Sequence, residues 1–434
     1  MRTRFAGILS TLLLQTAIGL WAQVSDSTGK PADSPVLHTG VTGRISASGL
    51  NDPQYVLSFP PVQRLLLRAT QHCLMQNEIQ KELLDTPVSL AHLIRLELLQ
   101  EHENTYCLNY LLLTVQDQQT MYKVAARYGQ SLATDFRVHK HEFDEIVGQY
   151  PNSDLRSQLL FDLVAGVSLN WGGLDLTTEL GYRIKPPRHT NGDVYFVHSD
   201  ELGAKLDFGG LYFDSETGRG SKMSFSTFGD GNSLPRLLGL PDVFDGVETA
   251  TDSWRNTPDV YGALQSEYVT YVLLALEDAG LVVDAVENGN DTDSAIAKAV
   301  VISEDRRKAT LGLLTAVGYL RMTDNHHYVI GVPVLRESDK RLVEATLKIS
   351  RTIMADWLRK NYPLMQQELV NLSPMRNGVP FSLAFSEVWH YVFGFAAKSL
   401  AESGFYANPH ALGSRYDGYV PLVWATPLLK SPGN

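Results

Sequence analysis

The chain has 434 residues, of which 44% are hydrophobic and 20% are charged, and its formal net charge at pH 7 is −11. This is an ordinary globular composition, with enough length for two or three hydrophobic cores. The acidic balance disfavours nucleic acid as a partner, although a local basic face would still allow it.

Residues 1–22 have the pattern of a secretory signal peptide. Arg2 and Arg4 precede an apolar run that ends in the small residue Ala22, and this arrangement is typical of such segments. We therefore expect cleavage near Ala22 and export to the periplasm or the cell exterior, with an uncleaved membrane anchor as the alternative. Loss of the two arginines would move the net charge from −11 to about −13. No later segment is expected to span a bilayer.

Residues 23–58 are rich in Ser, Gly, Pro and Asp and are predicted to form a flexible lead-in. Pro60 and Pro61 then precede an amphipathic helix, which is followed by a short apolar piece, "CLM". Two further helices are predicted over 76–84 and 90–102, and a polar turn leads from them into the strand "YCLNYLLL". The expected order is helix, short strand, helix, turn, helix and hairpin strand.

A long helix is predicted after this strand. Thr114 can cap it while Asp117 reaches back to the cap residue. Apolar residues then recur at helical spacing and form one stripe, which comprises Met121, Val124, Ala125, Tyr128, Leu132 and Phe136. Such a stripe is typical of a core or of a dimer seam. A homodimer and pairing within the chain are therefore both open.

The same elements recur later in the chain. Tyr328 and Asp339 have the same spacing as Tyr106 and Asp117, and segments 159–182 and 383–406 share their length and their Leu-x-Phe start. Three matching elements in the same order indicate a duplication. We expect related halves at 59–200 and 262–426. A Gly/Asp/Phe-rich connector at 201–261 lies between them, and a tail at 427–434 comes after the second.

Residues 64–113 and the long helix after them resemble the winged-helix domains of bacterial ArsR- and MarR-like regulators, and residues 296–358 resemble them more weakly. The resemblance implies a helix-turn-helix with a wing and, in that family, usually DNA binding. The expected fold is α+β, mainly α. Each half would hold a winged-helix-like module, a long helix and a small α/β cap.

DNA recognition by such a module needs cations or amides near the start of the second helix. The first copy offers His92 and Arg95, and the second offers Arg306, Arg307 and Lys308 as nucleic-acid or partner contacts. The alternative for the second set is a solvated helix start whose charges pair with Glu304 and Asp305.

The resemblance also bears on the two cysteines. In a winged helix the short strand lies beside the wing strands, which would bring Cys73 close to Cys107. A disulfide there could stabilise an exported chain by on the order of 3 kcal/mol. The alternative is a pair of reduced, packed cysteines.

The sequence contains no assembled catalytic motif, neither a glycine-rich phosphate loop nor a Gly-x-Ser-x-Gly turn. His141 and Glu145 share a helix face as half of a metal site, but no third ligand can be assigned. Residues 228–233, "FGDGNS", are interpreted as a plain turn, because they lack the acids of a calcium loop. Further polar residues without an evident catalytic partner are His326, His327, His390, Asp162 and Glu387.

We therefore predict no catalytic, cofactor or metal residues. The leading hypothesis is a non-enzymatic exported binding or regulatory protein that uses duplicated winged-helix modules to contact a protein partner. One alternative is a DNA-binding transcription regulator whose N-terminal segment is not a working signal. Another is an exported enzyme with its site in the connector, and a cleft with convergent polar groups there would favour it.

Overall fold

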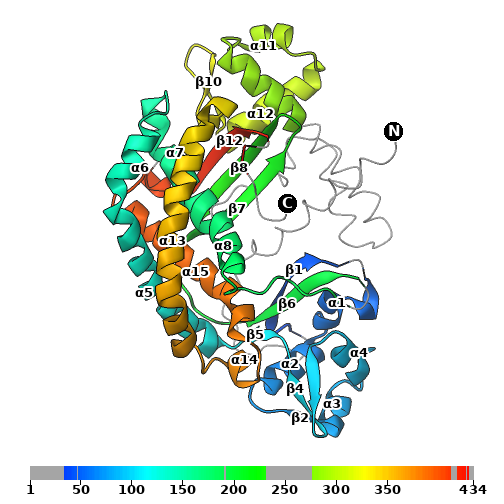
Figure 1. Cartoon of the computed structure of the whole chain (residues 1–434). Coiled ribbons are helices and arrows are strands. Elements are labelled where there is room, and N and C mark those ends of the chain that lie inside the picture. The colour runs from blue at the N-terminus through cyan, green and yellow to red at the C-terminus, as the bar shows by residue number, and fades with distance from the viewer. Residues whose placement is uncertain are drawn as a thin grey trace.

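A computed structural model describes residues 34–45, 47–189, 192–230, 276–411, 418–426 and 428–429. The structure is 54% helical and 17% strand, which confirms the mainly helical α+β class. Long helices run along one side of the molecule, and a small module lies at each end of them (Figure 1). The expected signal peptide, residues 1–22, lies outside the described residues.

The N-terminal module runs in the order helix, short strand, two helices and two paired strands. Its elements are α2 (Pro60–Ala69), β2 (Leu74–Met75), α3 (Gln76–Glu82), α4 (Leu90–Arg95), β3 (Leu99–His102) and β4 (Thr105–Leu108). Strand β4 lies between β2 and β3. Pro60 and Pro61 occupy the first turn of α2, where their missing N–H groups remove no helical hydrogen bond. The module encloses a hydrophobic core of its own.

The expectation of a flexible lead-in over 23–58 is wrong for the part that the structure describes. This part forms β1 (Leu37–Arg44), η1 (Gly49–Asn51) and α1 (Pro53–Leu57). Strand β1 pairs antiparallel with β6 (Val194–Glu201), from Leu37 opposite Glu201 to Arg44 opposite Val194. The composition is typical of a loop, but the strand partner lies far along the chain, and local composition cannot reveal it.

The predicted strand 106–113 is divided between two sheets. Strand β4 ends at Leu108, and β5 (Leu111–Leu113) pairs parallel with β6 in a sheet of order β1-β6-β5. Between the two strands, the Tyr110 hydroxyl donates a hydrogen bond to Ser199 Oγ at 3.3 Å. Asn109, the one polar residue in the stretch 106–113, lies at the break, and a single polar residue in an otherwise apolar run is too weak a signal to predict it.

The helices of this layer come from both sides of the connector. They are α5 (Val115–Val138), α6 (Lys140–Val147), α7 (Arg156–Phe161), α8 (Gly173–Glu179), α13 (Lys340–Glu368), α14 (Ser373–Arg376) and α15 (Phe381–Glu402), with short 3-10 turns η2 (Ser153–Leu155), η5 (Glu337–Asp339) and η6 (Pro409–Ala411). Helix α5 packs along α15, and α13 packs across the π-helical segment η3 (Asp162–Gly172). The predicted stripe of α5 is buried in this layer, so pairing within the chain covers it.

One helical stretch, Ser153–Glu179, is long and apolar enough to cross a membrane by composition, contrary to expectation. Of its apolar window, 83% is buried inside the molecule. It is therefore a core element of the helical layer, and in the described part of the chain it is the one such candidate.

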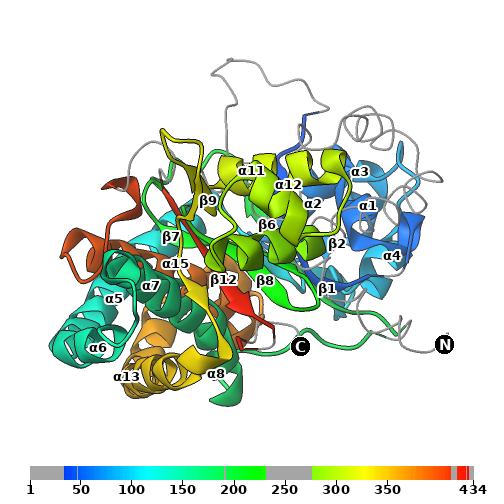
Figure 2. The ribbon, with the colours of Figure 1, turned by 90° about the horizontal axis from the view of Figure 1, so that it is seen from above.

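The connector contributes β7 (Tyr212–Arg219) and β8 (Met223–Asp230) to a central sheet of order β11-β12-β8-β7, and its residues 231–261 lie outside the described ranges. Strand β11 (Val334–Leu335) runs parallel to β12 (Tyr419–Ala425), and β12 runs antiparallel to β8. The sheet lies between the helical layer and the C-terminal module. That module holds helical residues 276–287, α11 (Asp293–Ala299), α12 (Glu304–Val317), β9 (Leu320–Met322) and β10 (Tyr328–Ile330). Viewed from above, α11 and α12 lie to one side of α5, α6 and α13 (Figure 2).

Candidate functional site

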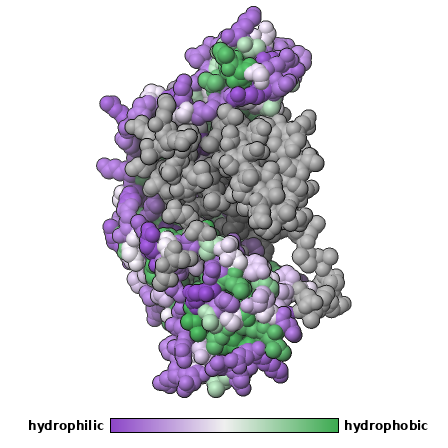
Figure 3. All heavy atoms as spheres, turned by 90° about the vertical axis from the view of Figure 1, so that its right-hand side faces the viewer, coloured by the Kyte–Doolittle hydropathy of each residue, from purple (hydrophilic) through white to green (hydrophobic). Residues whose placement is uncertain are grey.

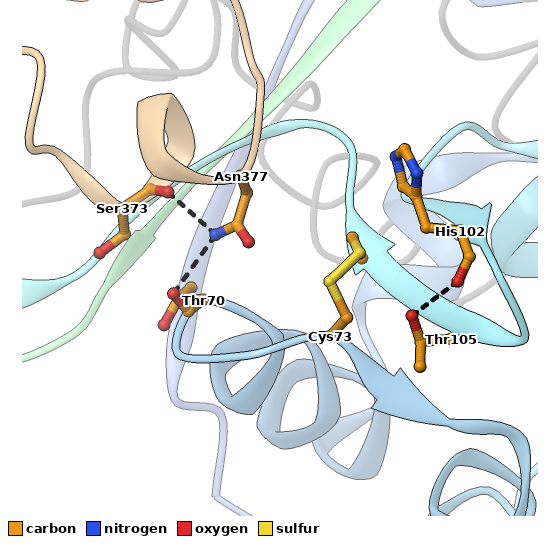
Figure 4. Close-up of a disulfide and its surroundings, with 7 residues drawn as sticks. Thr70, Cys73, His102, Thr105, Ser373 and Asn377 are labelled. Atoms are coloured by element: carbon orange, nitrogen blue, oxygen red, sulfur yellow. Dashed lines mark hydrogen bonds between the residues drawn. A yellow bond between two sulfur atoms is a disulfide. The ribbon is translucent and has the colours of Figure 1, made fainter.

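A disulfide joins Cys73 and Cys107 in the N-terminal module, with the Cα atoms 4.2 Å apart (Figure 4). Strand pairing brings them together, because the next residue, Leu74, lies opposite Tyr106 on β4. Beside the bridge, Asn377 Nδ2 donates a hydrogen bond to the carbonyl oxygen of Thr70 at 3.3 Å. The covalently closed module therefore contacts the loop after α14 directly.

The two contact residues predicted on α4 are both engaged within the module. His92 Nδ1 accepts a hydrogen bond from the Ser89 backbone N–H at 2.9 Å, so this side chain caps the start of α4. Arg95 donates to the Leu50 carbonyl oxygen at 3.1 Å from an exposed position. The helix therefore presents no unpaired arginine to a nucleic acid.

The three cations predicted on α12 form ion pairs. Arg306 makes two 2.7 Å hydrogen bonds to the nearly buried carboxylate of Asp278, and Arg307 contacts Asp293 at 2.9 and 3.4 Å. Lys308 lies 2.7 Å from Glu304. The expected alternative was that all three pair with Glu304 and Asp305. It is correct for Lys308 alone, because the two arginines bind acids of neighbouring helices. The hydrogen bond from Arg307 holds the pKa of Asp293 below its usual value.

The histidines show no metal chemistry in the described residues. His141 lies 3.6 Å from Glu145, and both side chains are largely exposed. Among the residues that the structure describes, no three His, Cys, Asp or Glu side chains are grouped to hold a metal ion. His327 pairs with Asp291 at 2.9 Å, and His390 Nδ1 lies 2.8 Å from the Ser386 carbonyl oxygen. Of the "FGDGNS" segment, only residues 228–230 are described.

A pocket of about 270 Å³ with several polar and charged residues in its walls lies where the connector meets the end of α15. Its walls come from three regions that are distant in sequence. Gly209, Gly210, Tyr212 and Asp230 belong to the connector, Lys398 and Glu402 to α15, and Asn408 and His410 to the segment after it. This is the kind of cleft that the enzyme hypothesis anticipated in the connector.

The pocket is organised around Asp230, which is 3% exposed. One carboxylate oxygen accepts a hydrogen bond from the Gly210 backbone N–H at 2.6 Å and lies 3.5 Å from His410 Nε2. Gly210 has a φ of +72°, a conformation in which a larger side chain would be strained. The tight glycine loop therefore brings a backbone donor onto a buried acid.

A second set of hydrogen bonds fixes the opposite wall. The Tyr212 hydroxyl donates to Asn408 Oδ1 at 2.9 Å, and the same oxygen accepts the His410 backbone N–H at 3.0 Å. Lys398 Nζ donates to the Gly209 carbonyl oxygen at 2.8 Å. These contacts hold cationic, amide and aromatic groups around one space.

A separate group of titratable side chains lies between β6 and α15. Burial raises the pKa of Asp200 to about 6; His198 opposes this shift and Glu387 adds to it. Burial, with the charges of Asp200 and Glu387, also raises the pKa of Tyr391 well above its usual value. Glu387 therefore has charged neighbours here, which its position in the sequence did not indicate. Asp162 is fully buried, and neither of its carboxylate oxygens has a hydrogen-bond partner among the described residues.

Comparison with known proteins finds no protein-family model that matches the chain, no similar curated protein and no similar solved structure.

The residues that line the pocket were not predicted from the sequence, because they are scattered along the chain between Gly209 and His410. The available signals were the paired glycines at 209–210 and the Gly-Asp pair at 229–230, which indicate sharp turns. Residues 229–230 are the end of strand β8 rather than a turn, and nothing local indicated that both segments face the end of α15.

Proposed function

We propose that this chain is a non-enzymatic, exported binding protein that contacts a protein partner through two winged-helix-like modules. One observation carries the proposal: the helix-turn-helix cations are paired internally, while the turns of both modules expose apolar side chains. A surface with this distribution favours a protein over a polyanion.

The winged-helix assignment is supported by the N-terminal module. Its order of α2, β2, α3, α4, β3 and β4, with β4 in the middle of the sheet, is the order expected of that fold. The C-terminal module has helical residues 276–287, then α11 and α12, and then the hairpin β9–β10. In this module the Tyr328 N–H donates a hydrogen bond to the carbonyl oxygen of Asp291, which lies just before α11. This contact corresponds to the pairing of β4 with β2, the strand just before α3, in the N-terminal module.

The segments after the two modules support the proposal of two related units. Asp117 and Asp339 both accept a hydrogen bond from the backbone N–H three residues earlier, at 3.0 and 2.8 Å. Strand β5 then pairs parallel with β6, and β11 pairs parallel with β12. Strand β6 also pairs antiparallel with β1, which precedes the N-terminal module in the chain. Strand β12 pairs antiparallel with β8, which precedes the C-terminal module.

The proposed contact surfaces are the helix-helix turns. Leu84, between α3 and α4, is 80% exposed, and Val301, between α11 and α12, is 100% exposed. Met75 and Ile94 add apolar area on the N-terminal module. Apolar surface gathers over the lower end of the molecule, with a smaller patch at the upper end (Figure 3). Apolar patches of this kind mark interaction sites.

Export is part of the proposal. The N-terminal segment has the pattern of a signal peptide, and a disulfide in the first module suits an oxidising compartment. The localisation experiment is N-terminal sequencing of the native protein from fractionated cells. A chain that begins near Gln23 in an extracytoplasmic fraction supports export, and an intact Met1 in the cytoplasm would leave DNA binding as the better hypothesis.

The partner experiment places a photo-crosslinking amino acid at Leu84, at Val301 and, as a control, at Val138. Val138 is 78% exposed but ends α5, away from both turns. We expect protein crosslinks from Leu84 and Val301 that are absent from Val138. Equal labelling at all three positions, or tight salt-dependent binding of the purified chain to duplex DNA, would contradict the proposal.

A further inference from the structure

We propose that the connector pocket binds a small zwitterion of the size of a free amino acid. The pocket is about 270 Å³, which lies near the lower end of the range for small-molecule sites. This site is separate from the helix-turn-helix surfaces, so the inference does not depend on the proposed protein partner.

One side of the pocket offers hydrogen-bond donors. Lys398 Nζ donates one hydrogen bond, to the Gly209 carbonyl oxygen, and an ammonium group has three N–H bonds to give. Asn408 uses its carbonyl oxygen as a double acceptor, and its amide nitrogen donates to none of the described residues. An ammonium beside an amide NH₂ group suits a carboxylate.

The other side offers negative charge. Asp230 is buried, and Glu402 is exposed at the mouth of the pocket with no ion-pair partner among the described residues. A ligand ammonium group would form a charge-assisted hydrogen bond with Glu402. Asp230, whose carboxylate already accepts the Gly210 N–H, adds negative charge to the wall. The ring of Tyr212, 5.9 Å from that of His410, supplies the apolar part of the wall.

The separation of the two charges on α15 supports a ligand that carries both signs. Lys398 and Glu402 are one helical turn apart, a spacing at which Lys and Glu commonly pair. Here Lys398 is held by Gly209, and no ion pair joins it to Glu402. A zwitterion can satisfy both groups at once, whereas a singly charged ligand would leave one of them unmatched.

The test is isothermal titration of the full chain with each of the common free L-amino acids, and then with acetate and methylammonium. We expect at least one amino acid to bind in the micromolar to low millimolar range, at least tenfold more tightly than either singly charged probe. Lys398→Met and Glu402→Gln should each weaken that binding at least tenfold. Lys360→Met and Glu344→Gln, which change exposed residues on α13 instead, should leave it unchanged.

The outcomes are decisive because each variant is first checked by its unfolding temperature without ligand. If one pocket variant fails to fold, the other decides alone, since the proposal requires both charges. The absence of binding by any amino acid would overturn the proposal. So would acetate binding as tightly as the amino acids, or binding that survives Lys398→Met and Glu402→Gln.

Discussion

At the scale of single residues, two acids have raised pKa values that link stability to pH: Asp162, which is fully buried, and Asp200, which is partly buried. Asp162 begins the π-helical segment η3 with no hydrogen bond from the described residues to either carboxylate oxygen, and burial raises its pKa well above the usual value. Asp200 has charged neighbours, and its pKa rises to about 6. A raised pKa in the folded state means that the neutral form of each acid is the one that folding favours.

Replacement of Asp162 by Asn should raise the free energy of unfolding at pH 8 by on the order of 2 kcal/mol, because the buried amide needs no protonation. The gain should shrink as the pH falls towards the usual pKa of an aspartate. Urea unfolding at both pH values measures it. Asp135→Asn, on the exposed face of α5, is the matched control and should be neutral. A loss of stability in Asp162→Asn at pH 8 would show that the carboxyl has a role in the core.

Ionisation of Asp200 should lower the free energy of unfolding as the pH rises. Its contribution is fully present below the unfolded pKa of 3.8 and is lost as the pH rises through about 6, which amounts to about 3 kcal/mol at most. Asp200→Asn should therefore match the wild type at pH 4 and exceed it at pH 7. Parallel stability curves for the two proteins between these pH values would contradict the assignment.

At the scale of elements, the fold depends on how closely α5 and α15 approach. A Cβ atom on Gly129 would lie 2.5 Å from Phe395 Cβ and 2.6 Å from the Val392 carbonyl oxygen. The second contact is with backbone, which cannot rotate away. Gly312 in α12, in contrast, has open space around its Cα atom.

Alanine at these two glycines should therefore have opposite effects. Gly312→Ala should stabilise the protein by up to about 1 kcal/mol, since alanine is the better helix former. Gly129→Ala has the same propensity gain but should destabilise by about 2 kcal/mol or more, because the helices must separate. Thermal unfolding of both variants measures the difference. Two shifts of the same sign would mean that α5 and α15 are not in close contact.

The disulfide between Cys73 and Cys107 should stabilise the N-terminal module. The Cys73→Ser, Cys107→Ser double variant should lose on the order of 3 kcal/mol of stability through the loop of 34 residues that the bridge closes. Reduction of the wild type should have the same effect, while the double variant should not respond to reductant. Thermal melts with and without dithiothreitol provide the comparison, and identical melts for all four samples would exclude a structural bridge.

The sequence predicted several elements whose signals are local, but the helix expected over 90–102 is wrong in its second half, because α4 ends at Arg95 and residues 99–102 form β3. The capping pair Thr114 and Asp117 marks the start of α5 correctly, because a cap involves residues three apart. It did not predict β1, or the division between β4 and β5, because both depend on β6. The charges of α12 show the same limit. The Lys308–Glu304 pair is local and was anticipated, whereas the partners of Arg306 and Arg307 lie on other elements.

At the scale of the whole molecule, the main core joins both sides of the connector. Helix α5, which precedes the connector, packs on α15, which follows it. Helix α13, which follows the connector, packs on η3, which precedes it. The buried residues of these helices form one cluster. The two proposed units therefore share one interior. Neither would bury its long helices if it were alone.

A cut in the connector should leave the protein assembled. A protease site inserted after residue 250 and then cleaved should give two fragments that elute together at the size of the intact chain. They should separate in denaturant. Cleavage at the same site in the Gly129→Ala variant is the informative comparison, because the weakened contact of α5 with α15 should promote dissociation. Fragments of the wild type that separate in native buffer would contradict a shared core.

The pairing of β1 with β6 also determines when the first module can be finished. A ribosome that has made residue 108 has synthesised all the helices of that module and strands β2, β3 and β4. The strand that β1 needs is not made until residues 194–201, and Tyr195 and Val197 belong to the same core as Leu37. The emerging chain therefore carries an unpaired strand near its start until almost half of it has been synthesised, and the earliest part of the protein to appear is among the later parts to be completed.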